Sequence, residues 1–425
     1  MKKSILAVAL LGLVAAPFAA DAQTGRSASV SPELLAAVQS TYIFTFGDGV
    51  RRDQVRARAE DAVRRVNGRV EFVYSDSIKG FSARMNAVAA ERMARQVPDI
   101  VAYEQDQVVT TQATAAESLP ILSTAPWGTV RVKGQVCGLP YSRVWVIDTG
   151  IDLTHPALNI AEAALHFSVY KTAADGNGHG THVAGTIGAK AIGTAARGVA
   201  PGVPVVPVRV LDNSGSGSLS GVIAGVDYVS KQKTKACTTP VSEWCDKREA
   251  WVANMSLGSG YSLAVNNAVL AAAKNGIRFA IAAGNSAADA ATASPASAND
   301  VNIFTVAATD SADVWAYFSN YGSPVDIAAP GVKINSTYKG GVYKTLSGTS
   351  MAAPHVAGIL TMTPALLSNP SNSPSGTALI VGSVAYTDKA VNRTVTDSYP
   401  IAAYQGAAPQ TPASGSACVY KQKLK

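Results

Sequence analysis

The sequence predicts an α/β protein in which a three-layer αβα domain with a mostly parallel sheet follows a small α+β domain. From about residue 126 onward, short runs that are apolar on both faces alternate with helical or turn-rich stretches. Such runs are typical of a parallel sheet that is covered by helices on both sides. The preceding hundred residues instead show a strand–helix–strand–strand–helix–strand order, which is typical of a small split-βαβ domain.

The small domain is expected within residues 23–115. Its strands are predicted at Tyr42–Phe46, within the alternating run from Val70 to Met85, and at Ile100–Val109, and its helices at Gln54–Val66 and Val88–Gln96. The small polar residues of Thr110–Ala115 then predict a linker. A removable pro-segment and a domain that stays in the mature protein are both compatible with this pattern.

The large domain is expected over residues 116–425. Its buried strands are predicted at Val144–Ile147, Val203–Val210, Trp251–Ser256, Ile277–Ala282 and Ile303–Ala307. Helices are predicted at Thr181–Ala189, at Leu219–Lys231, at Leu263–Asn275 and over the residues that follow Gly348. Ligands of such domains bind outside the carboxyl ends of the parallel strands, so we expect the functional site there.

Residues 1–22 have the pattern of a secretory signal. Lys2 and Lys3 precede the apolar run Ile5–Val14, and Ala20–Ala22 forms an A-x-A cleavage site. The apolar run is too short to span a bilayer, and no later stretch is long enough. We therefore expect a secreted protein without a membrane partner, cut after residue 22.

The cysteines and the charge fit an exported globular protein. Cys137, Cys237, Cys245 and Cys418 can form two disulfides in three ways, and the short Cys237–Cys245 loop together with Cys137–Cys418 is the favoured pairing. The net charge is +7, but the basic residues are scattered along the chain. We expect a solvated basic surface and no nucleic-acid partner.

The segment SGTSMAAPHVAG, Ser347–Gly358, carries the first candidate for chemistry. Gly348 lets the backbone approach a ligand, and Ser350 is expected at or near a helix N-terminus, where unpaired N–H groups face outward. An oxyanion that forms beside this serine would meet backbone donors. Pro354 is expected in the opening turns, where a missing N–H costs little. The alternative interpretation is an ordinary N-cap serine that precedes a packing helix.

Two further polar residues lie where such a site needs them. Asp148 ends the first buried strand, although an aspartate there can also cap a turn. His179 lies in DGNGHGTHVAG, at a glycine-rich helix start that it shares with His182. These two histidines could instead bind a metal, but the sequence offers no third His, Cys or Glu nearby.

Asp148, His179 and Ser350 together have the chemistry of a nucleophilic triad. A serine hydroxyl is a weak nucleophile near neutral pH and needs a base such as histidine. The histidine in turn needs a carboxylate, which fixes its tautomer and stabilises the imidazolium. We therefore predict Ser350 as nucleophile, His179 as general base and acid, and Asp148 as its orienting carboxylate.

The blocks VIDTGID, GHGTHVAG, AAGN and SGTSMAAPHVAG resemble the catalytic and oxyanion blocks of the subtilisin-like serine proteases. The stretches APWG, VLDNSGSGSLSGVIAGVDYV, SLGSGYS, SPAS and FSNYGSPVDIAAPG are similar to the proteinase K branch. The resemblance covers roughly Ala125–Leu360, and the Asp, His, Ser order is that of subtilisin itself. The N-terminal part resembles the inhibitor-type propeptide of this family. The resemblance implies a pro-segment that aids folding and whose C-terminal tail fills the active-site cleft until it is cut off between Val109 and Ser118.

The resemblance also implies roles for further residues. Asn285 in AAGN would donate its side-chain amide to the oxyanion beside the Ser350 N–H, although Gly–Asn is also a common turn. Ser256, Leu257 and Gly258 would form a wall of the pocket for the residue before the scissile bond. The segment Gly215, Ser216, Gly217 would pair with the substrate backbone, unless it is only a flexible loop.

The pocket and a calcium site follow from the same resemblance. Ala293 stands where the proteinase K branch often has a bulky aromatic, which implies a roomy apolar pocket for large hydrophobic or aromatic residues. Asp326 with the carbonyls of Val301 and Ile303 would hold a structural calcium, or would equally form a capped turn. We expect no cofactor for catalysis.

The predicted function is that of a secreted, self-processing serine endopeptidase, acting as a monomer on polypeptides and inhibited by its own propeptide. An esterase is a weaker alternative, because that class usually has a G-x-S-x-G elbow and the order Ser, Asp, His. A catalytically dead peptide-binding relative is the other alternative, but all four catalytic groups are present.

Overall fold

The computed structural model describes residues 30–113, 125–134, 142–190, 197–238 and 251–362, and the backbone of two strands, Ile380–Asp388 and Arg393–Ala402. The predicted signal segment lies outside the described residues. So do Cys137, Cys245, Cys418 and the side chain of Cys237, and with them the predicted disulfides. Among the described helices, none is long and apolar enough to cross a bilayer.

The N-terminal part is a four-stranded antiparallel sheet with helices. Its elements are β1 Thr41–Phe46, α2 Val55–Arg64, β2 Arg69–Tyr74, β3 Gly80–Arg84, α3 Ala87–Gln96 and β4 Ile100–Gln105. The sheet order is β2-β3-β1-β4, so the predicted strand–helix–strand–strand–helix–strand arrangement is present. Its core is centred on Phe44 and Phe81, whose rings stack at 5.0 Å.

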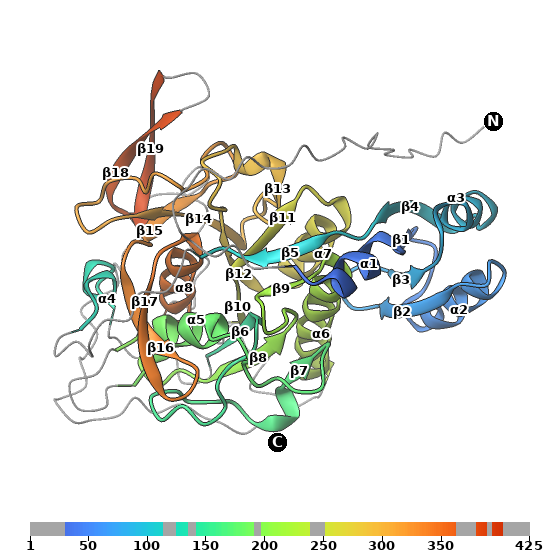
Figure 1. Cartoon of the computed structure of the whole chain (residues 1–425), viewed down its shortest axis with the longest axis horizontal. Coiled ribbons are helices and arrows are strands. Elements are labelled where there is room, and N and C mark those ends of the chain that lie inside the picture. Colours follow the sequence, from blue (N-terminus) through green and yellow to red (C-terminus); the bar gives the residue numbers. More distant parts are fainter. Residues whose placement is uncertain are drawn as a thin grey trace.

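A further helix, α1 (Pro32–Gln39), precedes this unit and was not predicted. Ser31 caps it, because its side chain accepts the N–H of Leu34 and Pro32 occupies the first turn. In Figure 1, α1 lies at the junction between the small sheet and the rest of the protein.

The large domain is built on a nine-stranded sheet of order β18-β19-β15-β14-β12-β10-β6-β8-β7. Every neighbouring pair is parallel except β18 and β19. The strands are β6 Arg143–Asp148, β7 Phe167–Ser168, β8 Val205–Arg209, β10 Trp251–Met255, β12 Arg278–Ala282, β14 Ile303–Thr309, β15 Ile327–Pro330, β18 Ile380–Asp388 and β19 Arg393–Ala402. The predicted three-layer α/β architecture is confirmed.

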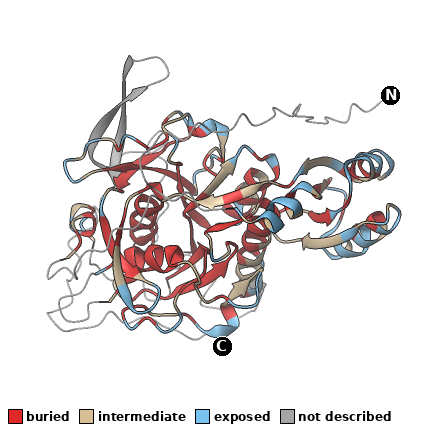
Figure 2. Ribbon diagram, viewed as in Figure 1, coloured by how far each residue is buried: buried red, intermediate tan, exposed pale blue. Residues whose placement is uncertain are grey.

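Helices cover both faces of this sheet (Figure 1). They are α5 His179–Gly188 and α8 Thr349–Leu360 on one face, and α6 Leu219–Thr238 and α7 Leu263–Lys274 on the other. In β6, Val144 and Val146 pack in the core of α5 and α8, whereas Trp145 and Ile147 pack in the core of α6 and α7. This alternation explains why the strand is apolar throughout, and Figure 2 shows the buried layers.

Smaller elements complete the described chain. They are the short helix α4 Trp127–Arg131, the 3₁₀ turns Arg52–Gln54, Ala163–Leu165 and Ala290–Thr292, and the antiparallel hairpin of β16 Ile334–Tyr338 and β17 Val342–Leu346. The hairpin, which was not predicted, packs on α5: Ser336 Oγ donates to His182 O and Thr337 Oγ1 to Thr181 O.

The expected strand Ile100–Val109 and the expected linker after it are both wrong in detail. The chain breaks after β4 and resumes as β5 (Val108–Thr111) in a different sheet, of order β13-β11-β5-β9. The partners are β9 Ser216–Ser218, β11 Leu257–Gly260 and β13 Ala293–Ser294. Thr110 and Thr111 are β-branched and lie between two strands of the large domain, which makes them part of a sheet rather than a linker.

Candidate active site

Asp148 ends β6, an interior strand of the large sheet, and is fully buried. The N–H of Thr149 donates to its Oδ1 at 2.7 Å. The chain turns away at Gly150, whose φ of +103° suits glycine, and a Cβ there would come within 2.4 Å of Ala173 O. The strand therefore places a carboxylate at the carboxyl edge of the sheet, as the sequence predicted.

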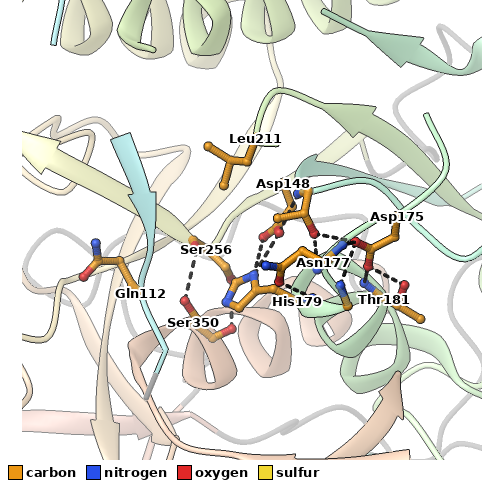
Figure 3. A network of polar contacts seen from close by, with 12 residues as sticks. Gln112, Asp148, Asp175, Asn177, His179, Thr181, Leu211, Ser256 and Ser350 are labelled. Carbon is orange, nitrogen blue, oxygen red and sulfur yellow. Dashed lines mark hydrogen bonds and ion pairs between the residues drawn. The ribbon is translucent and has the colours of Figure 1, made fainter. Parts of the chain in front are cut away.

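His179 is the first residue of α5 and lies beside Asp148. Its Nδ1 is 2.8 Å from Asp148 Oδ1 and 3.0 Å from Oδ2, so Nδ1–H donates to the carboxylate and Nε2 is left as the basic nitrogen (Figure 3). Gly178 caps the helix with φ of +115°, where a Cβ would lie 2.2 Å from the Tyr338 ring. The glycine before the histidine is therefore required by both conformation and space.

Ser350 is the second residue of α8, which packs against α5. Its Oγ donates to Ser256 O at 3.0 Å, and His179 Nε2 makes no hydrogen bond within the described part of the chain. The structure thus forms the Asp148–His179 half of the predicted relay. The hydroxyl has to leave the Ser256 carbonyl before it can donate to the imidazole.

Pro354 lies inside α8 and not in its opening turns, which corrects the expectation from the sequence. A proline cannot donate to the carbonyl four residues earlier, which here is that of Ser350. Ser256 Oγ donates to this carbonyl instead, at 2.9 Å, and Asn254 Nδ2 in turn donates to Ser256 Oγ at 2.9 Å. The proline thereby frees a backbone acceptor that ties the serine to strand β10.

Asp175 is a site residue that the sequence reasoning missed, although it lies in the same DGNGHGTH motif. Thr149 Oγ1 donates to its Oδ1 at 2.9 Å and Thr181 Oγ1 to its Oδ2 at 2.6 Å. The backbone N–H groups of Asn177, Gly178 and Thr181 also donate to it. One carboxylate thus joins the end of β6 to the start of α5, and so fixes Asp148 and His179 relative to each other (Figure 3).

Asn285 lies beside the N-terminus of α8. Its Oδ1 accepts both the N–H and the Oγ1 hydroxyl of Thr349, each at 2.9 Å, which fixes the orientation of the amide. Its Nδ2 is 3.1 Å from the point where a Cβ of Gly348 would be, and Gln112 O is 2.3 Å from the same point. The Ser350 N–H donates to Gln112 O at 3.0 Å. The Gln112 carbonyl oxygen therefore accepts one of the two predicted oxyanion donors, the Ser350 N–H, and the other, Asn285, lies beside Gly348.

The predicted substrate-binding residues line the two sides of β5. Thr110 pairs with Ser216 and Val109 with Gly217 on one side, and Thr111 pairs with Leu257 on the other. The Gln112 N–H donates to Ser256 O at 3.3 Å and the Thr111 N–H to Gly215 O at 3.0 Å. The predicted wall and the predicted pairing segment are thus the neighbours of one extended chain.

Gly258 and Ala293 occupy neighbouring strands in this sheet. The Gln112 side chain lies against Gly258, where a Cβ would be 3.2 Å from its Nε2. Ala293 pairs with Gly260, so it belongs to the same side of β5 as the predicted pocket wall. The absence of a side chain at Gly258 leaves room for the side chain of Gln112, whose carbonyl accepts the Ser350 N–H.

The structure does not favour the alternative that His179 and His182 bind a metal. His182 is fully buried and its Nε2 lies 3.0 Å from Ile334 O and 3.1 Å from Lys344 O, so that it donates to both carbonyls. Burial lowers its pKa to about 3, which keeps the ring neutral. Within the described ranges, no three His, Cys, Asp or Glu side chains cluster in a way that could hold a metal ion.

The predicted calcium residues lie near the starts of the neighbouring strands β14 and β15. Ile303 is its first residue and Val301 lies two residues earlier. Asp326 is nearly buried and its Oδ2 accepts the Thr305 N–H at 2.8 Å. This contact is that of a capped strand, and a cation at the same oxygen would compete with it.

The site combines a buried Asp–His pair with a serine on a helix, at the carboxyl edge of a parallel sheet. Beside it, one extended strand lies between β9 and β11. This combination defines the class of serine hydrolases that bind peptides. The comparisons agree. The profile of the subtilase family, peptidase S8, matches residues 142–395, and the chain belongs to this family. It is a subtilisin-like serine protease of the proteinase K-like group.

Several fungal relatives match over most of their length. Alkaline serine protease ver112 of Corniculantispora psalliotae is 42% identical over 318 residues, which cover 72% of this chain and 77% of the relative. Proteinase R of Parengyodontium album is 37% identical over 84% of this chain and 88% of its own. A cuticle-degrading protease of Metarhizium anisopliae is 37% identical over 83% of this chain and 87% of its own.

Proposed function

We propose that the protein is a secreted serine endopeptidase in which Asp148, His179 and Ser350 form the catalytic triad. The single observation that carries this proposal is the buried hydrogen bond between His179 Nδ1 and Asp148 at 2.8 Å, next to helix α8, whose second residue is Ser350. Membership of the subtilase family supports the reaction class, and the predicted signal segment supports secretion.

The proposed reaction uses each group once per half-reaction. His179 Nε2 takes the proton of Ser350 Oγ, which attacks the substrate carbonyl carbon, while Asp148 stabilises the imidazolium. The Ser350 N–H and the Asn285 amide stabilise the oxyanion. The imidazolium then protonates the leaving amine. Water hydrolyses the resulting acyl-enzyme by the same proton transfers in reverse order.

The proposed substrates are polypeptides that bind as an added strand between β9 and β11. The main-chain partners are those that β5 uses, namely Gly215, Ser216 and Gly217 on one side and Ser256, Leu257 and Gly258 on the other. Because these contacts are mostly to backbone, we propose broad specificity. Small residues at positions 258 and 293 support a preference for large hydrophobic or aromatic residues before the scissile bond.

We propose that residues 23–115 are a propeptide that inhibits the protease and is removed by it. Besides β5, three carboxylates join the two parts. Asp106 accepts Ser220 N and Oγ at the start of α6, and Glu104 accepts Leu263 N at the start of α7. In the other direction, Asp227 accepts the N–H groups of Ser75, Asp76 and Ser77. Helix N-termini favour such negative charges.

We also propose a structural calcium that is bound by Asp326 and the carbonyls of Val301 and Ile303, as the family resemblance implies. A carboxylate with two carbonyls would supply hard oxygen ligands, and the ion would stabilise the loop before β14 without taking part in catalysis. Catalysis itself is proposed to need no cofactor, and the mature enzyme is proposed to act as a monomer.

The decisive experiment compares the wild-type precursor with Ser350→Ala and with Ser347→Ala as a matched control. We expect the Ser350→Ala chain to stay full length and to leave casein intact, whereas the wild type and Ser347→Ala trim themselves and digest casein. An esterase would hydrolyse a model ester but not casein, and a dead relative would hydrolyse neither. Maturation of pure Ser350→Ala protein would contradict the proposal.

A further inference from the structure

The segment that leaves the small domain runs through the candidate active site. β5 lies between β9 and β11 and is antiparallel to both. Val109 is 1% exposed and packs in the core that contains Leu211, Leu219 and Leu257. The segment is therefore anchored by backbone pairing on two sides and by one buried apolar side chain, three residues before Gln112.

The end of this segment is aligned with the nucleophile and not merely near it. The carbonyl oxygen of Gln112 accepts the Ser350 N–H at 3.0 Å. The backbone N–H of Gln112 donates to Ser256 O at 3.3 Å. The chain then passes Gly348, where a Cβ would lie 2.3 Å from Gln112 O and 2.9 Å from the Ala113 Cα. Only a glycine at 348 leaves room for this peptide unit.

We propose that the first bond the protein cuts is its own Gln112–Ala113 bond. This inference rests on the proposed function and specifies its first substrate. Within the described ranges, the Ser350 N–H donates to the Gln112 carbonyl, whereas the preceding residue, Thr111, is held through its own N–H by Gly215 O. The maturation window predicted from the sequence, Val109 to Ser118, thereby narrows to one bond.

The step is a hydrolysis that balances without any co-reactant except water. Ser350 Oγ bonds to the carbonyl carbon of Gln112 and its proton passes to His179. The carbon–nitrogen bond to Ala113 breaks, and His179 returns the proton to the Ala113 amine. Water then releases Gln112 as a free carboxylate and restores the Ser350 hydroxyl.

The inference also specifies a class of substrate side chain. The pocket before the scissile bond receives an uncharged amide on a flexible aliphatic stem, which lies against Gly258, while Val109 fills an apolar position three residues earlier. The site therefore accepts a glutamine before the cut when the preceding residues supply a well-fitting strand. A peptide with the sequence of residues 108–115, VVTTQATA, is the corresponding probe.

The test follows the full precursor from its first cut by mass spectrometry of both fragments. We expect an N-terminal fragment that ends at Gln112 and a C-terminal fragment that begins at Ala113, before any later trimming. The mature enzyme should cut VVTTQATA between Gln and Ala. A first N-terminal fragment that ends at another residue, from a chain that digests casein, would overturn the inference and leave the proposed function intact.

Two variants make the test independent of later trimming. Ala113→Pro turns the scissile peptide into a tertiary amide and keeps Gln112 in the extended region that the strand already uses, so the fragment ending at Gln112 should be lost. Ala113→Gly is the matched control and should still release the fragment that ends at Gln112. Release of that fragment by Ala113→Pro would overturn the inference, whereas its release by pure Ser350→Ala protein would overturn the proposed function. Failure of the wild type to digest casein would also overturn the proposed function.

Discussion

The carboxylate of Asp106 makes the contact between the two parts of the chain sensitive to pH. It is 5% exposed and lies at the start of α6, where Ser220 N donates to it at 3.1 Å. Burial raises its pKa from 3.8 to about 6, against the hydrogen bonds from Ser220, Gln107 and Leu219, which lower it. We predict that Asp106→Asn, made in the inactive Ser350→Ala precursor, removes most of this pH dependence.

The size of the pH effect follows from the pKa shift of Asp106. A difference of about two pKa units corresponds to about 3 kcal/mol between the protonation states. Because the pKa is raised in the assembled state, that state binds the proton more tightly. The stabilisation is complete below about pH 4 and is lost as the pH rises through about 6. Well above pH 6 the contribution of Asp106 to stability no longer changes with pH. The two parts should therefore separate more readily at neutral and alkaline pH than in acid.

The assay is the free energy of unfolding of both proteins between pH 4 and pH 8, from urea titrations. The asparagine variant should gain up to about 3 kcal/mol relative to its parent between pH 4 and pH 7, because its amide resembles the protonated acid. Asp48→Asn, at an exposed position of the same domain, is the control and should show no comparable trend. A difference between Asp106→Asn and its parent that does not change with pH would refute the reasoning.

Three further predictions test the site, the interface and the metal. Asn285→Ala should lower kcat on a peptide by about 10²–10³, the loss that follows removal of one oxyanion donor in subtilisin, and an unchanged kcat would exclude Asn285 from the oxyanion site. Val109→Ala should destabilise the Ser350→Ala precursor by about 1–3 kcal/mol in urea unfolding, because a fully buried side chain is truncated, while Val101→Ala at an exposed position should change little. A chelator should lower the melting temperature of the mature enzyme, and Asp326→Ala should abolish that response; identical melting curves with and without chelator would argue against structural calcium.

The strands of the large sheet could be predicted because their residues are buried on both faces. Val144–Ile147 and Ile277–Ala282 give the same signal from either side, whichever helix covers them. Helix α6 was underestimated, since it continues past Lys231 to Thr238 through a polar stretch without apolar periodicity. The Ser31–Pro32 start of α1 has an N-cap signature, but only eight helical residues follow it.

The family resemblance predicts that the end of the propeptide fills the active-site cleft, but local sequence does not predict that Val108–Thr111 forms a strand there. Its hydrogen-bond partners Gly215 and Ser256 are more than a hundred residues away along the chain, and its threonines are equally typical of a linker. The role of Asp175 was missed for a related reason. Its five hydrogen bonds depend on how β6 meets α5, whereas Asp148, His179 and Ser350 could be proposed from their chemistry and motifs alone.

The arrangement of β9 and β11 has a consequence for what the enzyme can attack if β5 is released as proposed. Each strand then presents backbone donors and acceptors toward a gap one polypeptide wide, and only a segment that can straighten over several residues satisfies both rims at once. Helices and tightly folded loops must first unravel. Resistance of a target protein should therefore follow the local unfolding energy of its surface segments more closely than their composition.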